Sequence, residues 1–197
     1  DERTIRTRVD KIVSLVKANK KPLSLDELDA KLDYEHPSHI EAVANVSKLL
    51  STLNDQWGLT KWPTVNPKNI RDKIYVVLEE HKEPMHFSDI AKAISSSDFK
   101  RKNVTVQAIH NELIKDSRFV LIGRGIYALD SWGFEKGTVS DIITKILMKA
   151  GSEGLSRKEI VKQVLRERKV KETTVLLNLQ NKNLFTRVGK DHYKVAK

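Results

Sequence analysis

The chain contains no cysteine among its 197 residues, which excludes disulfide bonds and any metal site with thiolate ligands. It also lacks any apolar run close to the ~20 residues that are needed to span a bilayer, so we expect no membrane association. No secretory signal peptide is visible at the N-terminus. Of the eight glycines, none belongs to a glycine-rich phosphate-binding loop ahead of a helix.

Patterns of catalytic and metal-binding residues are missing as well. The six histidines are scattered along the chain. His36 and His39 lie three apart, but they lack the third ligand and the nearby glutamate of a metalloprotease helix. The carboxylates fall in helix-capping or surface positions, and no serine or aspartate motif indicates nucleophilic catalysis. We therefore expect a protein that is not an enzyme and that uses no metal, no other cofactor and no small-molecule substrate.

What the sequence has in excess is positive charge. It contains 36 Lys and Arg against 26 Asp and Glu, which gives a net charge of +10 and a pI near 9.7. The net charge is zero over residues 1–66, +2 over 67–136 and +8 over 137–197. A basic chain is attracted to polyanions, of which nucleic acid is the commonest, although charge can also serve solubility alone. We favour a nucleic-acid partner, bound mainly by the last third of the chain.

One order of elements is predicted three times: a helix, a chain break, a capped second helix, a third helix and a strand pair. The second helix begins near Leu23, Met85 and Leu155, and each start follows a proline or a glycine. A repeat of this length predicts a tandem array of small domains rather than a solenoid. We predict a mainly α fold with small antiparallel hairpins, in three tandem winged helices over 1–66, 69–134 and 137–197, joined by short linkers at 66–69 and 134–138.

Two of the second helices open with capping-box spacing. Ser24 precedes Glu27 by three residues, and Ser156 precedes Glu159 by three. In a capping box the hydroxyl accepts from an amide of the first turn, and the carboxylate accepts from the amide of the serine. Both pairs therefore predict the start of a helix.

The first unit departs from the pattern in its second half. A third helix is predicted from Ile40 to Leu53, with Val46 and Leu50 on its apolar side. The residues from Trp57 to Pro63 are strand-like and are expected to replace the wing. Because this unit has no net charge, we expect a degenerate winged helix that serves as a protein-interaction or spacer unit.

The middle unit contains the clearest helix pattern. Val106, Ile109 and Leu113 recur at i, i+3 and i+7, which predicts an amphipathic helix over residues 103–116. Hydrogen-bonding and cationic side chains occupy the other face of this helix. A helix with such a face can enter a groove of DNA.

A hairpin is predicted directly after this helix. Residues 119–122 and 126–129 have the composition of two short strands, and Gly123-Arg124-Gly125 joins them. The flanking glycines allow a tight turn that exposes the guanidinium of Arg124. Such a hairpin can lie along a phosphate backbone, and the helix and hairpin together form the second half of a winged helix.

Three stretches of the middle unit show a family resemblance: His86-Phe87-Ser88-Asp89-Ile90-Ala91, Val106 to Leu113, and Arg118 to Leu129. They resemble the HARE-type helix-turn-helix, a winged-helix family of chromatin proteins, restriction systems and bacterial transcription proteins. The family includes the delta subunit of bacterial RNA polymerase, and similar arrays accompany sigma-factor-like segments. The resemblance covers about residues 69–134, and Trp57-Gly58-Leu59 ahead of Trp62 resembles the end of the same fold.

The resemblance implies a module that associates with DNA or polymerase and has no catalysis of its own. We predict a double-stranded DNA-binding, transcription-associated protein, with RNA polymerase or another transcription protein as a further partner. Two alternatives stay open: a protein-interaction module on polymerase or chromatin machinery, and a modified-DNA reader of a restriction system. The expected location is the cytoplasm, at the nucleoid, in a bacterium and the nucleus in a eukaryote.

The candidate DNA contacts follow from side-chain chemistry, because Asn and Gln pair with adenine whereas Lys and Arg suit guanine or phosphate. In the middle unit they are Lys100, Arg101, Lys102, Thr105, Gln107, His110, Asn111, Lys115 and Arg124. In the third unit they are Lys169, Lys171, Thr173, Thr174, Asn178, Arg187 and Lys190. The alternative is that these residues form the solvated faces of amphipathic helices, and that His110 is a half-buried histidine.

Overall fold

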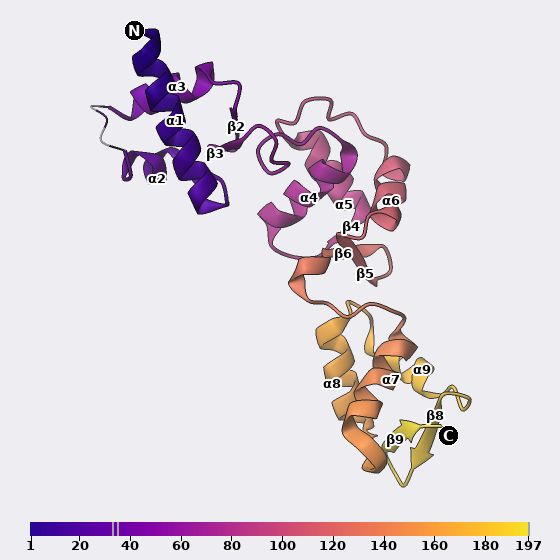
Figure 1. Cartoon of the computed structure of the whole chain (residues 1–197). Coiled ribbons are helices and arrows are strands. Elements are labelled where there is room, and N and C mark those ends of the chain that lie inside the picture. Colours follow the sequence, from indigo (N-terminus) through magenta and orange to yellow (C-terminus); the bar gives the residue numbers. More distant parts are fainter. Residues whose placement is uncertain (33, 35, 197) are drawn as a thin grey trace. The chain divides into compact units, whose positions relative to one another are not determined.

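The structure, a computed structural model, describes residues 1–32, 34 and 36–196 (Figure 1). Along these residues one order of elements occurs three times: helix, short strand, helix, helix and hairpin. Each repeat forms its own three-stranded antiparallel sheet, and the strand orders are β1-β3-β2, β4-β6-β5 and β7-β9-β8. The predicted fold class, mainly α with small antiparallel hairpins, is confirmed.

The chain forms two compact units, residues 1–80 with 93–105 and residues 81–92 with 106–197. The border between them passes through α5 (Phe87–Ser96). The other elements of the first unit are α1 (Glu2–Asn19), β1 (Leu23–Ser24), α2 (Leu25–Asp29), α3 (Pro37–Val46), β2 (Leu50–Leu53), β3 (Gln56–Leu59) and α4 (Ile70–His81).

One apolar core holds the first repeat together. Ile12 of α1, Leu28 of α2 and Ile40 of α3 are fully buried, and Trp57 of β3 joins them in the same cluster. In α1 the buried residues Ile12, Val13 and Val16 form the stripe that packs into this core. Trp57 is a core residue, which leaves it no role as an exposed platform for a ligand.

The third helix of the first repeat is shorter than predicted. α3 ends at Val46, which is 67 % exposed, and the following residues form the hairpin β2–β3. Asn54 and Asp55 form its two-residue turn with φ of 49° and 56°. A type I′ turn requires positive φ at both positions, and Asn and Asp tolerate it. The prediction that the helix continues to Leu53 and that no regular wing follows was therefore wrong.

The capping box at the start of α2 is confirmed. The Ser24 hydroxyl accepts from the Glu27 amide at 3.2 Å, and Glu27 Oε2 accepts from the Ser24 amide at 2.8 Å. At α8 (Arg157–Glu167) only half of the predicted box forms. The Glu159 amide donates to the Ser156 hydroxyl at 3.3 Å, whereas the Glu159 carboxylate accepts from Gln163 at 2.9 Å.

This difference predicts unequal effects for two matched substitutions. Glu27→Ala removes the bond to the serine amide and should lower the free energy of unfolding by about 0.5–1 kcal/mol. Glu159→Ala removes the same first-turn charge but no bond to Ser156, so we expect less than half that loss. Urea denaturation of the two variants tests this, and equal losses would contradict the geometry.

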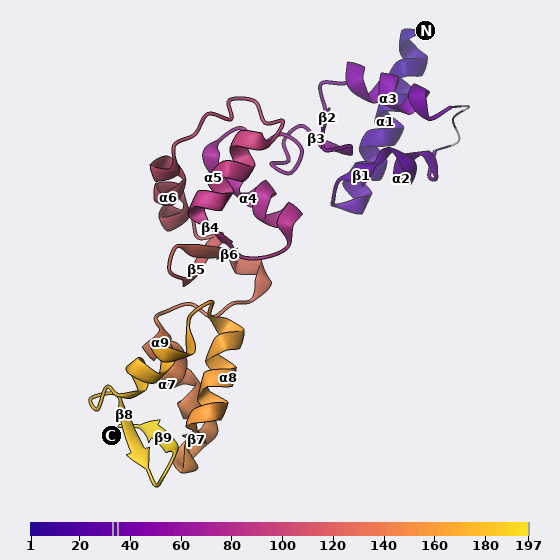
Figure 2. The same cartoon turned by 180° about the vertical axis from the view of Figure 1, so that it is seen from behind.

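The second unit contains the sheets of the middle and third repeats. Its elements besides α5 are β4 (Met85–His86), α6 (Val106–Lys115), β5 (Phe119–Gly123), β6 (Ile126–Leu129), α7 (Val139–Ala150), β7 (Leu155–Ser156), α8, α9 (Glu172–Leu179), β8 (Phe185–Val188) and β9 (His192–Val195), with short 3-10 turns at Asp130–Trp132 and Gly151–Glu153. In the third repeat β9 pairs with β7 and lies against α7 (Figure 2).

The predicted hairpin of the middle repeat is confirmed by β5 and β6. Ile109 and Leu113 of α6 are buried as expected, but Val106 at the start of this helix is 44 % exposed and does not belong to the buried stripe. In the third repeat Ile142, Ile160 and Val175 bring α7, α8 and α9 into one core.

Candidate nucleic-acid interface

A line of four rings fixes the position of α6 relative to the turn between β5 and β6. The ring centroids of His86 and Phe87 are 4.3 Å apart, those of Phe87 and His110 4.8 Å, and those of His110 and Tyr127 6.3 Å. The Phe87 amide also donates to the Gly125 carbonyl at 2.9 Å. His110 is half-buried in this line, so its ring serves to join α6 to the hairpin.

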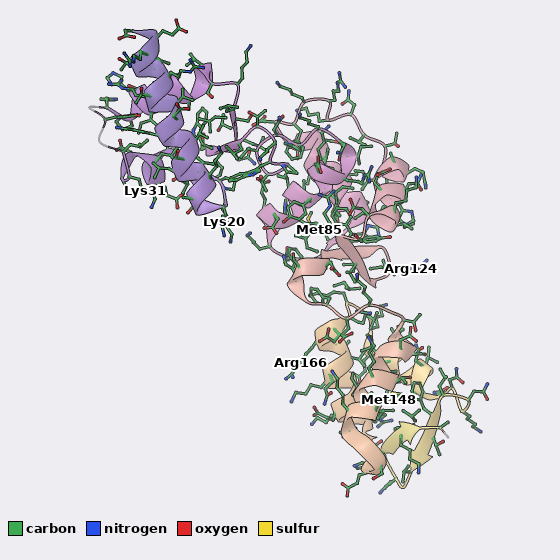
Figure 3. All side chains as sticks on the ribbon, viewed as in Figure 1. Lys20, Lys31, Met85, Arg124, Met148 and Arg166 are labelled. Carbon is green, nitrogen blue, oxygen red and sulfur yellow. The ribbon has the colours of Figure 1, made fainter. Side chains whose placement is uncertain are left out.

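The turn of the hairpin presents Arg124 to solvent. Gly125 has φ of +72°, and a Cβ at this position would lie 2.5 Å from Nε2 of His86. Glycine is therefore required both for the backbone conformation and for the contact with the rings. The exposed Arg124 side chain extends from this turn (Figure 3).

The solvent face of α6 carries a pair of amides and a cation. Gln107, Asn111 and Lys115 are exposed, and Gln107 Nε2 donates to Asn111 Oδ1 at 3.0 Å. This bond does not use the Gln107 oxygen or the Asn111 nitrogen. The pair can thus offer one acceptor and one donor together, which is the combination that the major-groove edge of adenine recognises.

The basic loop ahead of α6 is held by a buried lysine of α4. Lys73 is 4 % exposed, and its ammonium donates to the Arg101 carbonyl at 2.8 Å. Burial lowers the pKa of Lys73, and the nearby charge of Arg101 lowers it further. Lys100, Arg101, Lys102 and Thr105 are all exposed, but the Lys102 ammonium donates to the Ser97 carbonyl at 3.0 Å. The loop backbone is therefore fixed while Lys100 and Arg101 face solvent.

In the third repeat the candidate residues separate into two groups. Lys169, Lys171, Thr173, Arg187 and Lys190 are exposed. The other two, Thr174 and Asn178, are half-buried.

Asn178 already has internal partners. Its amide donates to the Thr174 carbonyl at 2.8 Å, and its oxygen accepts from the Ser140 hydroxyl at 2.7 Å. The first bond lies within α9, and the second attaches α9 to α7. We therefore leave Asn178 out of the interface that we propose below.

Two of the exposed cations are held by hydrogen bonds, Lys169 through its backbone and Arg187 through its side chain. The Lys169 amide donates to the Ile122 carbonyl at 2.8 Å, and Lys169 forms a parallel bridge with Gly123 at the end of β5. The Arg187 guanidinium donates to the Lys190 carbonyl across the turn of the last hairpin. Both contacts limit the positions that these cations can adopt.

A hollow of about 520 Å³ lies between the end of α9 and the last hairpin. Its lining includes Gln180, Lys182, Arg187 and Tyr193. Sequence reasoning did not select Gln180 or Lys182, which follow the last turn of the helix. A sequence signal for Lys182 does exist: it is a basic residue in the short segment between the third helix and the hairpin.

Residues 70–132 match the family model HARE-HTH, whose description names ASXL and a restriction endonuclease HTH domain. This part of the chain is therefore a helix-turn-helix domain of that family, and the predicted resemblance is confirmed. No curated protein matches the chain. Among the described residues, no group of three or more His, Asp or Glu side chains is arranged to hold a metal ion. None of the helices within the described ranges has the length and apolar character needed to cross a membrane.

Among solved structures, the chain is similar to the crystal structure of a bacterial selenocysteine-specific elongation factor, EF-Sec, with a TM-score of 0.33 and 11 % identity. The alignment covers 98 % of this chain and 30 % of that structure. The chain thus spans less than a third of the length of that protein.

Proposed function

We propose that this chain is a non-catalytic protein of three tandem winged helices, over residues 1–66, 69–134 and 137–197, and that the second and third of them bind double-stranded DNA. The observation that supports this most is the geometry of the middle repeat. There the exposed Gln107–Asn111 pair of α6 lies on a helix that the rings fix relative to the Arg124 turn. The match of this segment to a helix-turn-helix family points to the same function.

In the proposed complex α6 enters the major groove and the Arg124 turn contacts a phosphate. The third repeat contributes mostly electrostatic attraction, because residues 137–197 have a net charge of +8. Its contacts are Lys171 and Thr173 at the start of α9 and Arg187 and Lys190 at the hairpin, all of which are exposed. Lys182, at the hollow beside the hairpin, joins this group.

We further propose that the DNA-bound protein acts in transcription, with RNA polymerase or another transcription protein as its partner. Its place in the cell would then be at the nucleoid or in the nucleus. The repeated order of elements supports the binding of neighbouring repeats to the same duplex. Helix-turn-helix units on short linkers can occupy adjacent grooves, because the linker raises the effective concentration of the second unit.

Fluorescence anisotropy of the full chain with a labelled random-sequence duplex tests the DNA-binding proposal. Between about 50 and 300 mM salt we expect log affinity to fall linearly with log salt, with a slope of about −0.9 for each phosphate neutralised. The absence of binding at the lowest salt concentration would contradict the proposal.

Single substitutions at the hairpin tips should each remove one phosphate contact. For Arg124→Ala and for Lys190→Ala we expect the salt slope to become shallower by about 1, with an affinity loss of about three- to tenfold at 100 mM salt. Arg166→Ala is the matched control, because Arg166 is an exposed cation that lines a hollow formed with α7 instead (Figure 3). An equal loss in the control variant would mean that only total charge matters.

A further inference from the structure

The first repeat contains a hollow with an apolar floor and a basic rim. Its volume is about 340 Å³, within the range of ~300–1,000 Å³ that is usual for ligand pockets. Val13 of α1, Leu49 ahead of β2 and Leu59 of β3 provide the apolar lining. The remaining lining residues are Thr60 and four lysines: Lys17, Lys48, Lys61 and Lys68. We refer to this site as the Leu49 hollow.

The walls of the Leu49 hollow are fixed by hydrogen bonds of one residue. The Thr60 amide donates to the Leu49 carbonyl at 2.9 Å, and the Thr60 hydroxyl donates to the Lys48 carbonyl at 3.0 Å. The Thr60 carbonyl in turn accepts from the side chain of Asn66 at 2.8 Å. The hollow is thus preformed, and a ligand would not have to order it on binding.

The apolar part of the hollow is both anchored and accessible. Val13 and Leu59 are 5 % and 6 % exposed and belong to the core, so they form a rigid floor. Leu49 is 56 % exposed, so its side chain offers apolar surface next to this floor. A partner that places an apolar side chain here removes this surface from water.

The charge around the hollow has one sign. None of the lining residues, all of them within the described part of the chain, is an aspartate or a glutamate. This contrasts with the zero net charge of residues 1–66 as a whole. The four lysines that line the hollow therefore have no carboxylate in the lining to neutralise them.

From this combination we propose that the Leu49 hollow is a docking site for an acidic amphipathic peptide segment of a partner protein. One apolar side chain of the peptide covers Leu49, and the carboxylates on either side of it pair with the lysines of the rim. A nucleic-acid backbone satisfies only half of this site, because phosphates pair with the lysines but leave the apolar floor uncovered. The site lies outside the proposed DNA contacts and does not depend on them.

The test uses the full chain and a fluorescein-labelled 12-residue peptide in which leucines alternate with glutamates. We expect saturable binding by anisotropy, and chemical-shift changes in 15N-labelled protein that centre on Val13, Leu49 and Thr60. Two control peptides separate the contribution of charge from that of apolar contact. The first has glutamine in place of every glutamate, and the second has serine in place of every leucine. Each should bind at least about tenfold more weakly.

Protein variants locate the site. The double charge reversal Lys48→Glu with Lys61→Glu should weaken the peptide about tenfold or more, because both positions change from attraction to repulsion. Leu49→Ser should weaken it about tenfold through loss of apolar contact. Lys31→Glu is the control. Lys31 is an exposed lysine of the same repeat (Figure 3) and does not line the hollow. We expect its replacement to change the peptide affinity less than about twofold.

Three results would overturn the docking site. They are the absence of peptide binding at low salt, equal binding by the Leu49→Ser variant, and complete displacement of the peptide by duplex DNA, which would make the hollow a nucleic-acid contact. Because the DNA titration uses Arg124 and Lys190, either proposal can fail while the other stands.

Discussion

Replacing Gly154 with alanine should remove β7 from the third sheet and lower the free energy of unfolding of the third repeat by about 3–5 kcal/mol. Gly154 has φ of +69°, and a Cβ there would lie 2.2 Å from the Tyr193 carbonyl oxygen and 2.9 Å from its carbon. Contacts this short with backbone atoms cannot be relieved by a change of rotamer.

Tyr193 cannot move away, because β9 is the central strand of its sheet. It pairs with Leu155 on one side and with Arg187 on the other. Leu155 and Tyr193 also pack against the core of the repeat. The added methyl group must therefore separate β7 from β9 and expose part of that core.

Gly189→Ala is the matched control for Gly154→Ala. Gly189 also has a positive φ, at +68°, but a Cβ there would meet no atom within 4 Å, whereas Gly154 combines its φ with a ψ of −166°, a region that residues with a Cβ avoid. We expect a loss of about 1 kcal/mol from the left-handed conformation alone. Hydrogen exchange over residues 137–196 measures the stability of the third repeat in both variants. Similar losses of stability would show that the backbone moves to relieve the clash at Gly154.

How far the sequence determined the fold depends on the kind of signal. Periodicity predicted α6 and capping predicted the start of α2, because one helix face and a few neighbouring residues decide these features. The same periodicity failed after Val46, since Leu50 and Leu53 continue a helical spacing although they belong to a strand. Only the Asn54–Asp55 turn distinguishes a hairpin from a continued helix here. The spacing of apolar residues gives no information about the positive φ values of that turn.

The two-residue strands β1, β4 and β7 were not predicted at all. Each of them exists only because it pairs with the last strand of its repeat, dozens of residues later. For the site, the sequence placed polar residues on the third helices but could not find their internal partners. Asn178 bonds with Ser140, which is 38 residues away, and His110 packs against Phe87. Such contacts arise from packing between elements, and local patterns do not contain them.

Arg168→Ala should release the linker between the middle and third repeats. Arg168 is 3 % exposed, and its guanidinium donates to the Glu167 carbonyl at 2.8 Å and to the Gly137 carbonyl at 2.7 Å. Burial lowers the pKa of Arg168, while the carboxylates of Glu167, Glu135 and Asp141 oppose that shift, so the group stays charged. Removing it should lower the free energy of unfolding by about 2–4 kcal/mol.

The linker at 134–138 is also tied down by its own residues. The Glu135 amide donates to Glu167 at 3.2 Å, and the Glu135 carboxylate pairs with Lys145 at 2.6 Å, which lowers the pKa of Glu135. These contacts lie at least partly in solvent and are weak in water without the buried guanidinium beside them. Loss of Arg168 should therefore free Lys136 for cleavage, and we expect trypsin to cut there about tenfold faster.

A freed linker should also weaken DNA binding without removing any phosphate contact. The effective concentration of the third repeat falls when its linker becomes flexible, so we expect an affinity loss of about tenfold in the anisotropy titration. The Arg124→Ala and Lys190→Ala variants should keep normal cleavage at Lys136, which separates the two mechanisms. Arg166→Ala, two residues away on the exposed side of α8, should change neither cleavage nor affinity. If Arg168→Ala alters stability but leaves both readouts unchanged, the repeats bind DNA independently of how rigidly they are joined.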